Sequence, residues 1–473
     1  MDGLKPGLKD RTAYLALLAI AAVAVMLRLY VLSRPSIALY DPDSGIYVQL
    51  AQGLRAGCGL RRLTGAGCAA PELLRTPGYP LFLALFRSPE NALAMQSLLG
   101  GMLCLPLGIF ALHRWGKAAG LCAAVLLAVD GPSILIAGMF LSDVLFALLV
   151  TLWMLLEIRA LETVAPRRAA FFVAIGAFCL SGALLVRPVG LLLLPVAVAM
   201  PFLGPQRRLH QAAMALLAIS LPALTVVAWT QRNATETGVG TYSVAGDINL
   251  YYYEAAGVVA RQRGESFEAA QRQLERAVGV SAGAAGQDGP WSPPAAGEHL
   301  RRALHAAGQR IVLHHLGLAS LVTLQNFVYV SLAPERSALA RILGTAGAHH
   351  VGPADAVEPG VWRIAATLRE MSASRLLTAL VVLQLAITLA AWCGVIRCMR
   401  YWRSASRNER MILLSLLAGI IALLLPAAGP EATARYRVPA APMLALMAGA
   451  GLFGERVGQR RSRATKSKPF GPA

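Results

Sequence analysis

The stretch TAYLALLAIAAVAVMLRLYVL, residues 12–32, decides the class of fold to which this chain belongs. It is almost wholly apolar and long enough to cross a bilayer as one helix. It is too long for a signal peptide and lacks a small-residue cleavage site, so we expect an uncleaved transmembrane helix. Nine further apolar stretches are long enough to cross, or nearly so, at residues 91–112, 118–136, 139–157, 169–186, 189–203, 211–230, 376–396, 411–429 and 438–455. The sequence therefore predicts an all-α polytopic membrane protein with about ten transmembrane helices, two of them short enough to be tilted, broken or re-entrant.

Composition and charge agree with this class. Of the 473 residues, 56% are hydrophobic and only 15% are charged, and the mean hydropathy is +0.56. The formal net charge is +19, and its lysines lie near the two ends and in one short loop: Lys5, Lys9, Lys117, Lys466 and Lys468. Because basic residues gather on the cytoplasmic side of membrane proteins, this pattern places both termini in the cytoplasm. Basic residues are not interleaved with aromatic residues, which argues against a nucleic-acid interface.

The predicted topology divides the chain into segments on the two sides of the membrane. We expect residues 249–278 to be helical, residues 281–297 to form an irregular linker, and the rest of 231–375 to form helices on the membrane surface that pack over the first outer loop. The segments are 1–32 (cytoplasmic N-terminus and first transmembrane helix), 33–89 (first outer loop with amphipathic helices), 90–230 (transmembrane helices), 231–375 (large outer-face region), 376–455 (last three transmembrane helices) and 456–473 (basic cytoplasmic tail).

Two cysteines lie in the first outer loop. Cys58 and Cys68 flank a glycine-rich turn on the face of the membrane where oxidation is permitted, so they are candidates for a disulfide, with free thiols as the alternative. No cysteine spacing resembles a zinc site. The adjacent pair His314 and His315 points to different sides of a helix and lacks a third ligand at a fixed spacing, which argues against a metal site there.

The segment YDPDSGIYVQLAQGL, residues 40–54, places two carboxylates directly after the first transmembrane helix. Asp41 followed by Pro42 is a favourable helix start, and an acidic residue in the first turn suits the helix dipole. Asp43 shares one helix face with Tyr47 and with the apolar residues that follow, so its carboxylate is expected at the mouth of the bundle. Capping is the structural alternative for Asp41, whereas Asp43 is the stronger functional candidate.

Further ionisable residues lie at ends of transmembrane segments on the same predicted face. Because ionisable groups at membrane depth are costly, they usually pair or serve a function, and snorkelling to lipid headgroups is the alternative for the arginines. Asp130, which precedes Gly-Pro, is most simply a turn residue. The functional candidates are Arg75, Asp143, Arg187, Arg435 and Arg437. Together they predict an outer-face cavity with carboxylates and arginines.

The order of these motifs resembles a known family. DSGIYVQLAQGL, RTPGYPLFLALF, DGPSILIAGMFLSDVLFALLV, LLVRPVGLLLLPV, GDINLYYYEAAGVVA and RYRVPAAPMLAL follow one another as in the GT-C membrane glycosyltransferases. More narrowly, the chain resembles the bacterial relatives of protein O-mannosyltransferases and of the aminoarabinose transferases that modify lipid A. The resemblance runs from about residue 12 to residue 455.

The resemblance implies a set of roles for matching residues. It implies that Asp43, with Tyr47 four residues on, is the catalytic carboxylate and that Asp41 is its near neighbour. It implies donor-phosphate binding by arginines, here Arg75, Arg187, Arg435 and Arg437, and a substrate cavity formed by Tyr47, Asp143, Tyr79 and Tyr251. Where relatives often have a second acidic residue, this chain has Ser44. No cofactor is assigned, and a divalent ion held by Asp41 and Asp43 stays an open alternative, since paired carboxylates suit a hard cation.

The chemistry of the candidates agrees with these roles. A sugar on a polyprenyl phosphate already has a good leaving group, so the enzyme needs a carboxylate to deprotonate the acceptor hydroxyl and cations to hold the phosphate. Arginine suits the second task because its planar fork meets two phosphate oxygens. We therefore expect an inverting glycosyltransferase that moves a sugar from a polyprenyl-phosphate donor to lipid A, a glycan or a protein.

Two other function classes compete with this interpretation. A ligase or polymerase of polyprenyl-linked glycans would place its decisive residues in 231–375. A flippase or transporter would place ionisable groups near the middle of the membrane, often in two repeated halves, and no repeat is present. The expected location is the bacterial inner membrane, with a multi-pass chain, both termini cytoplasmic and the site on the periplasmic face. The expected partners are the lipid-linked donor, a membrane-associated acceptor and the bilayer, with no nucleic acid.

Overall fold

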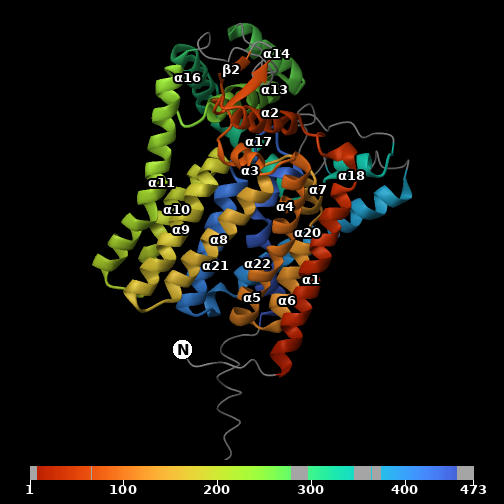
Figure 1. Cartoon of the computed structure of the whole chain (residues 1–473), viewed down its shortest axis with the longest axis vertical. Coiled ribbons are helices and arrows are strands. Elements are labelled where there is room, and N and C mark those ends of the chain that lie inside the picture. Colours follow the sequence, from red (N-terminus) through yellow and green to blue (C-terminus); the bar gives the residue numbers. More distant parts are fainter. Residues whose placement is uncertain (1–7, 65–66, 279–296, 346–363, 365–373, 455–473) are drawn as a thin grey trace, which may run out of the picture.

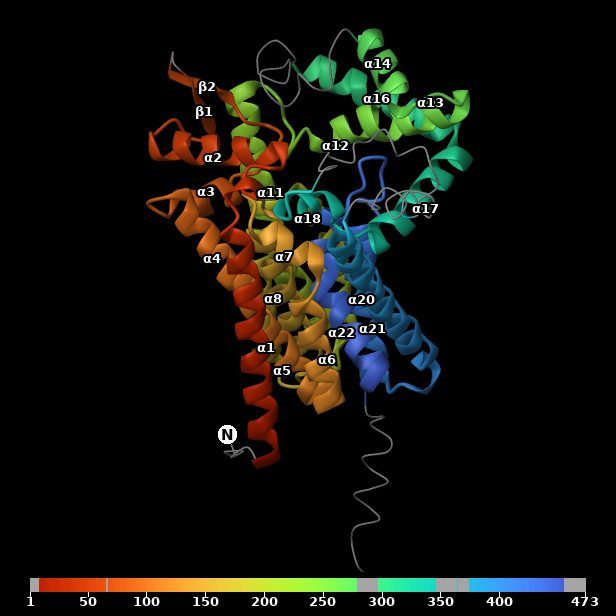
Figure 2. The ribbon, with the colours of Figure 1, turned by 90° about the vertical axis from the view of Figure 1, so that its right-hand side faces the viewer.

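The computed structural model describes residues 8–64, 67–278, 297–345, 364 and 374–454. Most of the predicted linker over 281–297 and all of the predicted basic tail over 456–473 lie outside the described residues. The described chain forms a bundle of long helices with a cap of shorter helices and one β-hairpin at one end, as Figures 1 and 2 show. The start of the first helix and the end of the last helix lie at the opposite end of the bundle from the cap.

The bundle is built from helices that occur in three parts of the chain. The first part contributes α1 (Leu8–Leu32), α4 (Pro89–Met102), α5 (Cys104–Trp115), α6 (Lys117–Ala128), α7 (Gly131–Ala137), α8 (Asp143–Glu162) and α9 (Pro166–Val186). Next come η2 (Pro188–Leu193), α10 (Leu194–Ala199), η3 (Met200–Leu203) and α11 (Arg208–Thr237). The last part contributes α20 (Arg375–Arg400), η7 (Trp402–Ser404), α21 (Arg407–Leu424) and α22 (Ala441–Phe453).

The cap and its junction with the bundle come from the two segments that were predicted to lie outside the membrane. The first segment contributes η1 (Pro35–Ile37), α2 (Pro42–Arg55), β1 (Arg61–Thr64), β2 (Gly67–Pro71) and α3 (Gly78–Ala84), and β1 pairs with β2 in antiparallel orientation. The second contributes α12 (Ala245–Ile248), η4 (Asn249–Ala255), α13 (Ala256–Arg263), α14 (Phe267–Val278), α16 (Glu298–His314), α17 (Leu316–Leu332) and α18 (Arg336–Ile342). The turn η8 (Ala434–Ala440) joins α21 to α22 and lies against α8 and α17.

The chain is a multi-pass membrane protein, and most of its predicted transmembrane segments are long helices. Within the described residues, seven helices are long and apolar enough to cross a membrane, and the count rises to eight when α6 and α7, which are bent by 50°, are taken as one broken span. The segment predicted at 189–203 is broken into short turns, α21 carries three charged residues in its first turn, and α22 is short, so these three fall outside the count.

One apolar stretch differs from the sequence-based expectation. Residues Leu316–Ile342 pass the same test of length and apolarity, although this part of 231–375 was predicted to lie on the membrane surface. In Figure 2, α17 slopes from the cap towards the bundle. This stretch is a weaker signal than the other apolar segments, because it follows a polar region, is interrupted near Pro334 and has the lowest mean hydropathy of the seven helices.

Close helix packing brings the bundle together at small residues. Gly394 of α20 and Gly451 of α22 lie at one such contact, where a Cβ atom added to Gly451 would lie 1.9 Å from the carbonyl oxygen of Gly394. Small residues let helix backbones approach in this way, which favours association between apolar helices in lipid. The cap has its own core, in which Phe267 and Leu274 of the amphipathic helix α14 pack with Tyr252 and Leu304.

Candidate active site

Helix α2 starts at the first carboxylate of the site. Asp41 is the N-cap residue, and its side chain accepts a hydrogen bond from the backbone N–H of Asp43 at 2.9 Å, while Pro42 occupies the first helical turn. The predicted cap is present because the carboxylate satisfies an N–H group that has no partner inside the helix. The Asp41 carboxylate also pairs with Arg435, whose Nη1 lies 2.9 Å from Oδ2. Asp41 therefore starts the helix and also belongs to a cluster of charges.

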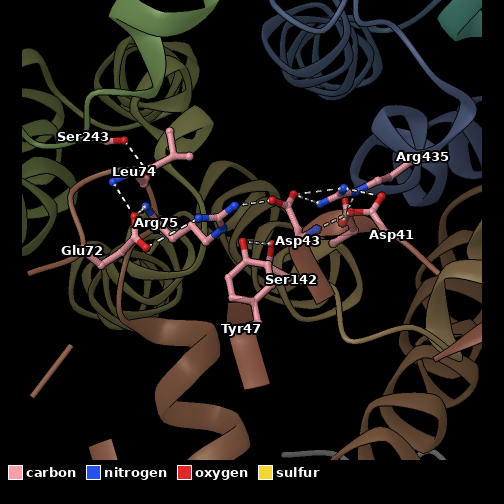
Figure 3. Close-up of polar contacts among 10 residues, drawn as sticks. Asp41, Asp43, Tyr47, Glu72, Leu74, Arg75, Ser142, Ser243 and Arg435 are labelled. Carbon is pink, nitrogen blue, oxygen red and sulfur yellow. Dashed lines mark hydrogen bonds and ion pairs between the residues drawn. The ribbon is translucent and has the colours of Figure 1, made fainter. Parts of the chain in front are cut away.

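Asp43 lies between two arginines, as Figure 3 shows. Its Oδ1 accepts from Nη2 of Arg75 at 2.6 Å, and its Oδ2 accepts from Nη1 and Nη2 of Arg435 at 3.2 Å. Burial opposes ionisation of this carboxyl group, but the charges of Arg75 and Arg435 outweigh burial and hold its pKa well below the usual range. Asp43 is therefore ionised at neutral pH.

A third carboxylate reaches the cluster from the bundle. Asp143 opens α8, and its Oδ2 accepts from Nε of Arg435 at 2.9 Å. Its Oδ1 accepts a short hydrogen bond from Nη1 of Arg187, the residue that ends α9. The Asp143 side chain is fully buried, and Arg187 and Arg435 are its charged partners there. The structure therefore brings predicted residues from α2, α8, η8 and the end of α9 together in one cluster of charges.

Two tyrosines support the cluster from the side of α3 and α4. The hydroxyl of Tyr47 lies 3.2 Å from Oγ of Ser142, and the guanidinium of Arg75 lies 5.8 Å from the centroid of the Tyr47 ring. The ring of Tyr79 packs edge-on against that of Tyr47 at 4.9 Å, and the Tyr79 hydroxyl donates to Oε1 of Gln96 at 2.8 Å. The ring contact with Tyr79 supports the position of Tyr47. Tyr79 itself is fully buried, so its side chain does not face either cavity.

A cavity of about 320 Å³ opens beside the cluster, and we call it the polar cavity because several charged residues line it. The carboxylates of Asp41 and Asp43 and the guanidinium of Arg435 line it on one side. Its remaining charged and aromatic lining was not predicted and comprises Glu335, Arg336, Glu431, Tyr40, Tyr253, Tyr329 and Tyr436. Such a lining offers many hydrogen-bond donors and acceptors next to ring faces, which suits a polyhydroxylated ligand.

A second, mainly apolar cavity of about 400 Å³ lies next to the first. Arg187 lines it together with Leu191 and Leu192, and its other apolar lining residues are Pro188, Val189, Leu423, Pro426, Ala427 and Pro439. Glu431 and Tyr436 line both cavities. Arg187 therefore places a positive charge beside the apolar cavity. The two cavities meet at Glu431 and Tyr436.

Several predicted site residues lie elsewhere. Arg437 donates from Nη1 to the backbone carbonyls of Ser331 and Ala333 at 3.0 and 3.1 Å, and its Nη2 lies 3.6 Å from Asp130. Tyr251 is buried in the cap, where its hydroxyl donates to the carbonyl of Leu274. These residues lie outside the lining of both cavities.

Arg75 differs from its predicted role, whereas Asp130 agrees with its predicted one. Arg75 belongs to the charge cluster, but its guanidinium pairs with Asp43 and also lies 3.5 Å from Glu72, and Arg75 lies outside the lining of both cavities. Asp130 caps α7 by accepting from the backbone N–H of Ser133 at 3.0 Å, as its turn sequence indicated. Of the predicted arginines, Arg187 and Arg435 are therefore the ones that line these two cavities.

The unpredicted acidic residues Glu254 and Glu431 lie close together, and Glu431 lines both cavities. A Cβ atom added to Gly429 would lie 2.5 Å from Oε1 of Glu254 and 2.5 Å from Oε2 of Glu431. Burial raises the pKa of Glu254 to about 7, and burial together with Glu254 raises that of Glu431 to about 8. A sequence signal for Glu431 is present, because it precedes Arg435 by four residues at the same outer end of the last apolar segment.

The outer-loop cysteines and the carboxylates bear on two further predictions. The sulfur atoms of Cys58 and Cys68 are bonded, with their Cα atoms 5.7 Å apart, and the disulfide joins the residues before β1 to β2 of the hairpin.

At the carboxylates, Arg435 contacts an oxygen of Asp41, of Asp43 and of Asp143. Within the described residues, no group of three or more His, Cys, Asp or Glu side chains is placed to hold a metal ion. Nη1 of Arg435 thus contacts both carboxylates, Asp41 and Asp43, for which a divalent ion was the alternative partner.

The architecture is shared with a solved membrane protein. No protein-family model matches this chain, and no curated protein sequence matches it. The archaeal oligosaccharyltransferase AglB from Archaeoglobus fulgidus, solved with an inhibitory peptide and a dolichol-phosphate, superimposes with a TM-score of 0.51 at 14% identity, covering 99% of this chain and 53% of AglB. ArnT from Cupriavidus metallidurans bound to undecaprenyl phosphate gives a TM-score of 0.38 at 15% identity, covering 96% of this chain and 81% of ArnT. This chain spans about half the length of AglB, and it has the GT-C fold.

Proposed function

We propose that this protein is an inverting glycosyltransferase that moves a sugar from a polyprenyl-phosphate donor to an acceptor hydroxyl at the outer face of the bacterial inner membrane. One observation carries the proposal: a polar cavity that contains Asp43 adjoins an apolar cavity that contains Arg187, and both share Glu431 and Tyr436. This arrangement suits a reaction between a lipid-linked sugar and a polar acceptor. AglB binds a dolichol-phosphate and ArnT binds undecaprenyl phosphate, as their structures record.

The apolar cavity suits the donor. Its leucine and proline lining can pack against isoprenoid carbons, while Arg187 is placed to pair with phosphate oxygens. The Arg187 guanidinium is held by Asp143, so its orientation is set before a donor enters. When the glycosidic bond breaks, negative charge grows on the phosphate, and a preorganised cation stabilises that charge without further rearrangement.

The polar cavity suits the acceptor. Asp43 is ionised and held from both sides by Arg75 and Arg435, yet its side chain keeps an exposed fraction of 34%. Its carboxylate can therefore accept a hydrogen bond from an acceptor hydroxyl and remove the proton as the new bond to the sugar forms. A single displacement inverts the configuration at the anomeric carbon.

Transfer from radiolabelled donors tests the proposal. Purified protein in nanodiscs is incubated with a panel of sugar polyprenyl phosphates and a bacterial membrane extract as the source of acceptor. The wild type is compared with Asp43→Asn, which keeps the shape of the side chain and removes its basicity, and with Arg187→Ala, which removes the cation of the apolar cavity. We expect a loss of at least 100-fold for Asp43→Asn, in line with the effect of losing a general base.

The control is Glu236→Gln, which changes a carboxylate in the last turn of α11 that pairs with Arg61 and lies outside the lining of both cavities. It should transfer sugar at the wild-type rate. Transfer by Asp43→Asn at the wild-type rate would show that Asp43 is only part of a helix start. The search would then turn to glycan ligation or lipid transport.

A further inference from the structure

Arg435 lies at the centre of the carboxylate cluster. Its Nε donates to Asp143 at 2.9 Å, its Nη1 donates to Asp41 at 2.9 Å, and both Nη1 and Nη2 donate to Asp43 at 3.2 Å. Oxygens of three carboxylates therefore surround one guanidinium, although as they are placed these side chains do not themselves form a metal-binding group. Carboxylate oxygens are also the ligands that a hard divalent cation prefers. Here the place between the carboxylates is occupied by the guanidinium of the chain itself.

The guanidinium of Arg435 offsets much of the negative charge around it. The cluster contains the carboxylates of Asp41, Asp43 and Asp143, with Glu72 beside Arg75, and three paired arginines, namely Arg75, Arg187 and Arg435. Only 10% of the Arg435 side chain is exposed, and Asp143 is fully buried. Ions removed from water to this extent need close partners of opposite charge. Removing Arg435 alone would take a charged partner from Asp41, Asp43 and Asp143 at once, with three carboxylate oxygens facing the vacated space.

We propose that Arg435 is a built-in cation that takes the place of a divalent metal ion between Asp41, Asp43 and Asp143. As a positioning residue it holds Asp43 towards the polar cavity, and this part of the inference rests on the proposed function. The protein therefore needs no added metal ion to organise its carboxylates. A variant that lacks the guanidinium acquires a binding site for a small divalent cation.

The test compares Mn²⁺ binding by the wild type, Arg435→Ala and Arg437→Ala, measured by electron paramagnetic resonance on purified protein in detergent. Arg437 is a matched control because it lies two residues away in the same turn and is also buried. It contacts two backbone carbonyls and the single carboxylate of Asp130, so its loss does not vacate the cluster.

We expect Arg435→Ala to bind Mn²⁺ at least tenfold more tightly than the wild type or Arg437→Ala, and Mn²⁺ to raise the melting temperature of Arg435→Ala alone. Arg435→Lys keeps one positive charge and should not gain Mn²⁺ binding. Equal Mn²⁺ affinity for all proteins, or no gain by a monodisperse Arg435→Ala, would overturn the inference. So would Mn²⁺ binding by Arg435→Lys as tight as that by Arg435→Ala.

A second measurement covers the case in which Arg435→Ala does not fold. Sugar transfer by the wild type is measured after treatment with EDTA, and we expect no change in rate. A tenfold or greater loss that Mn²⁺ restores would refute the built-in cation while leaving the glycosyltransferase proposal intact. If the wild type transfers sugar from no donor, the proposed function fails, and the Mn²⁺ comparison still decides the role of Arg435 as a cation.

Discussion

Replacing Glu431 by glutamine is expected to stabilise the protein at alkaline pH. The carboxyl groups of Glu254 and Glu431 approach one another around Gly429, and Oε2 of Glu431 is buried without a hydrogen-bond partner. Burial and the neighbouring Glu254 raise the pKa of Glu431 from 4.5 to about 8. A carboxyl group with a raised pKa binds a proton more tightly in the folded than in the unfolded chain. Its contribution is therefore present below pH 4.5 and is lost as the pH rises through about 8.

The magnitude follows from this difference in pKa. A tenfold change in proton affinity corresponds to about 1.4 kcal/mol, so ionising Glu431 in the folded protein costs about 5 kcal/mol relative to the unfolded chain. An unfolding entropy of about 2.1 cal/mol/K per residue, taken over 473 residues, gives roughly 1 kcal/mol/K. Glu431→Gln, whose side chain cannot ionise, should therefore melt up to about 5 °C above the wild type at pH 9.

The assay is thermal unfolding of protein in detergent, followed by tryptophan fluorescence between pH 5 and pH 9. The melting temperature of the wild type should fall across this range, whereas that of Glu431→Gln should fall less, and the two should agree at pH 5. Glu236→Gln, which removes an exposed ion pair with Arg61, serves as the control and should follow the wild type. A Glu431→Gln variant that melts below the wild type at pH 9 would refute this reasoning and indicate that the ionised carboxylate has a stabilising partner.

Two further substitutions test the packing of charges and helices. Asp143→Ala should lower the free energy of unfolding by about 3–5 kcal/mol, because it leaves Arg435 buried with one partner fewer, and a melting temperature within 1 °C of the wild type would contradict this. Gly451→Ala should prevent a monodisperse protein from being purified, because the added Cβ would lie 1.9 Å from the carbonyl oxygen of Gly394. Gly317→Ala, with open space at its Cβ position, should purify normally, and equal yields of the two variants would show that α20 and α22 can separate without loss of the fold.

Much of the architecture follows from local sequence signals. The stretch 12–32 forms α1 (Leu8–Leu32), and the stretch 376–396 forms α20 (Arg375–Arg400), close to the predicted limits. Backbone polar groups in lipid must be satisfied within the segment, so a long apolar run becomes a helix almost regardless of its neighbours. The start of α2 at Asp41 is equally local, since cap and first turn lie within three residues.

The lining of the cavities could not be read in the same way. Tyr251 was predicted to line a cavity, but Tyr253 does so, because side chains two residues apart along a helical turn lie on different faces of it. The same reason separates Arg435, which faces the carboxylates, from Arg437, which faces Asp130 and two backbone carbonyls. Sequence reasoning identified the right segment in both cases and could not choose the residue within it.

The sequence by itself determined that the chain is helical and crosses a membrane, and that carboxylates and arginines stand at the ends of its apolar segments. These properties depend on hydropathy and capping, which act over one helix. Only the tertiary structure decided that Asp41 and Arg435, separated by 394 positions, share one hydrogen bond, and that the same guanidinium reaches Asp43 and Asp143. Helix packing brings these groups together, and their burial then makes the pairing necessary, because desolvated charges are stable only beside charges of opposite sign.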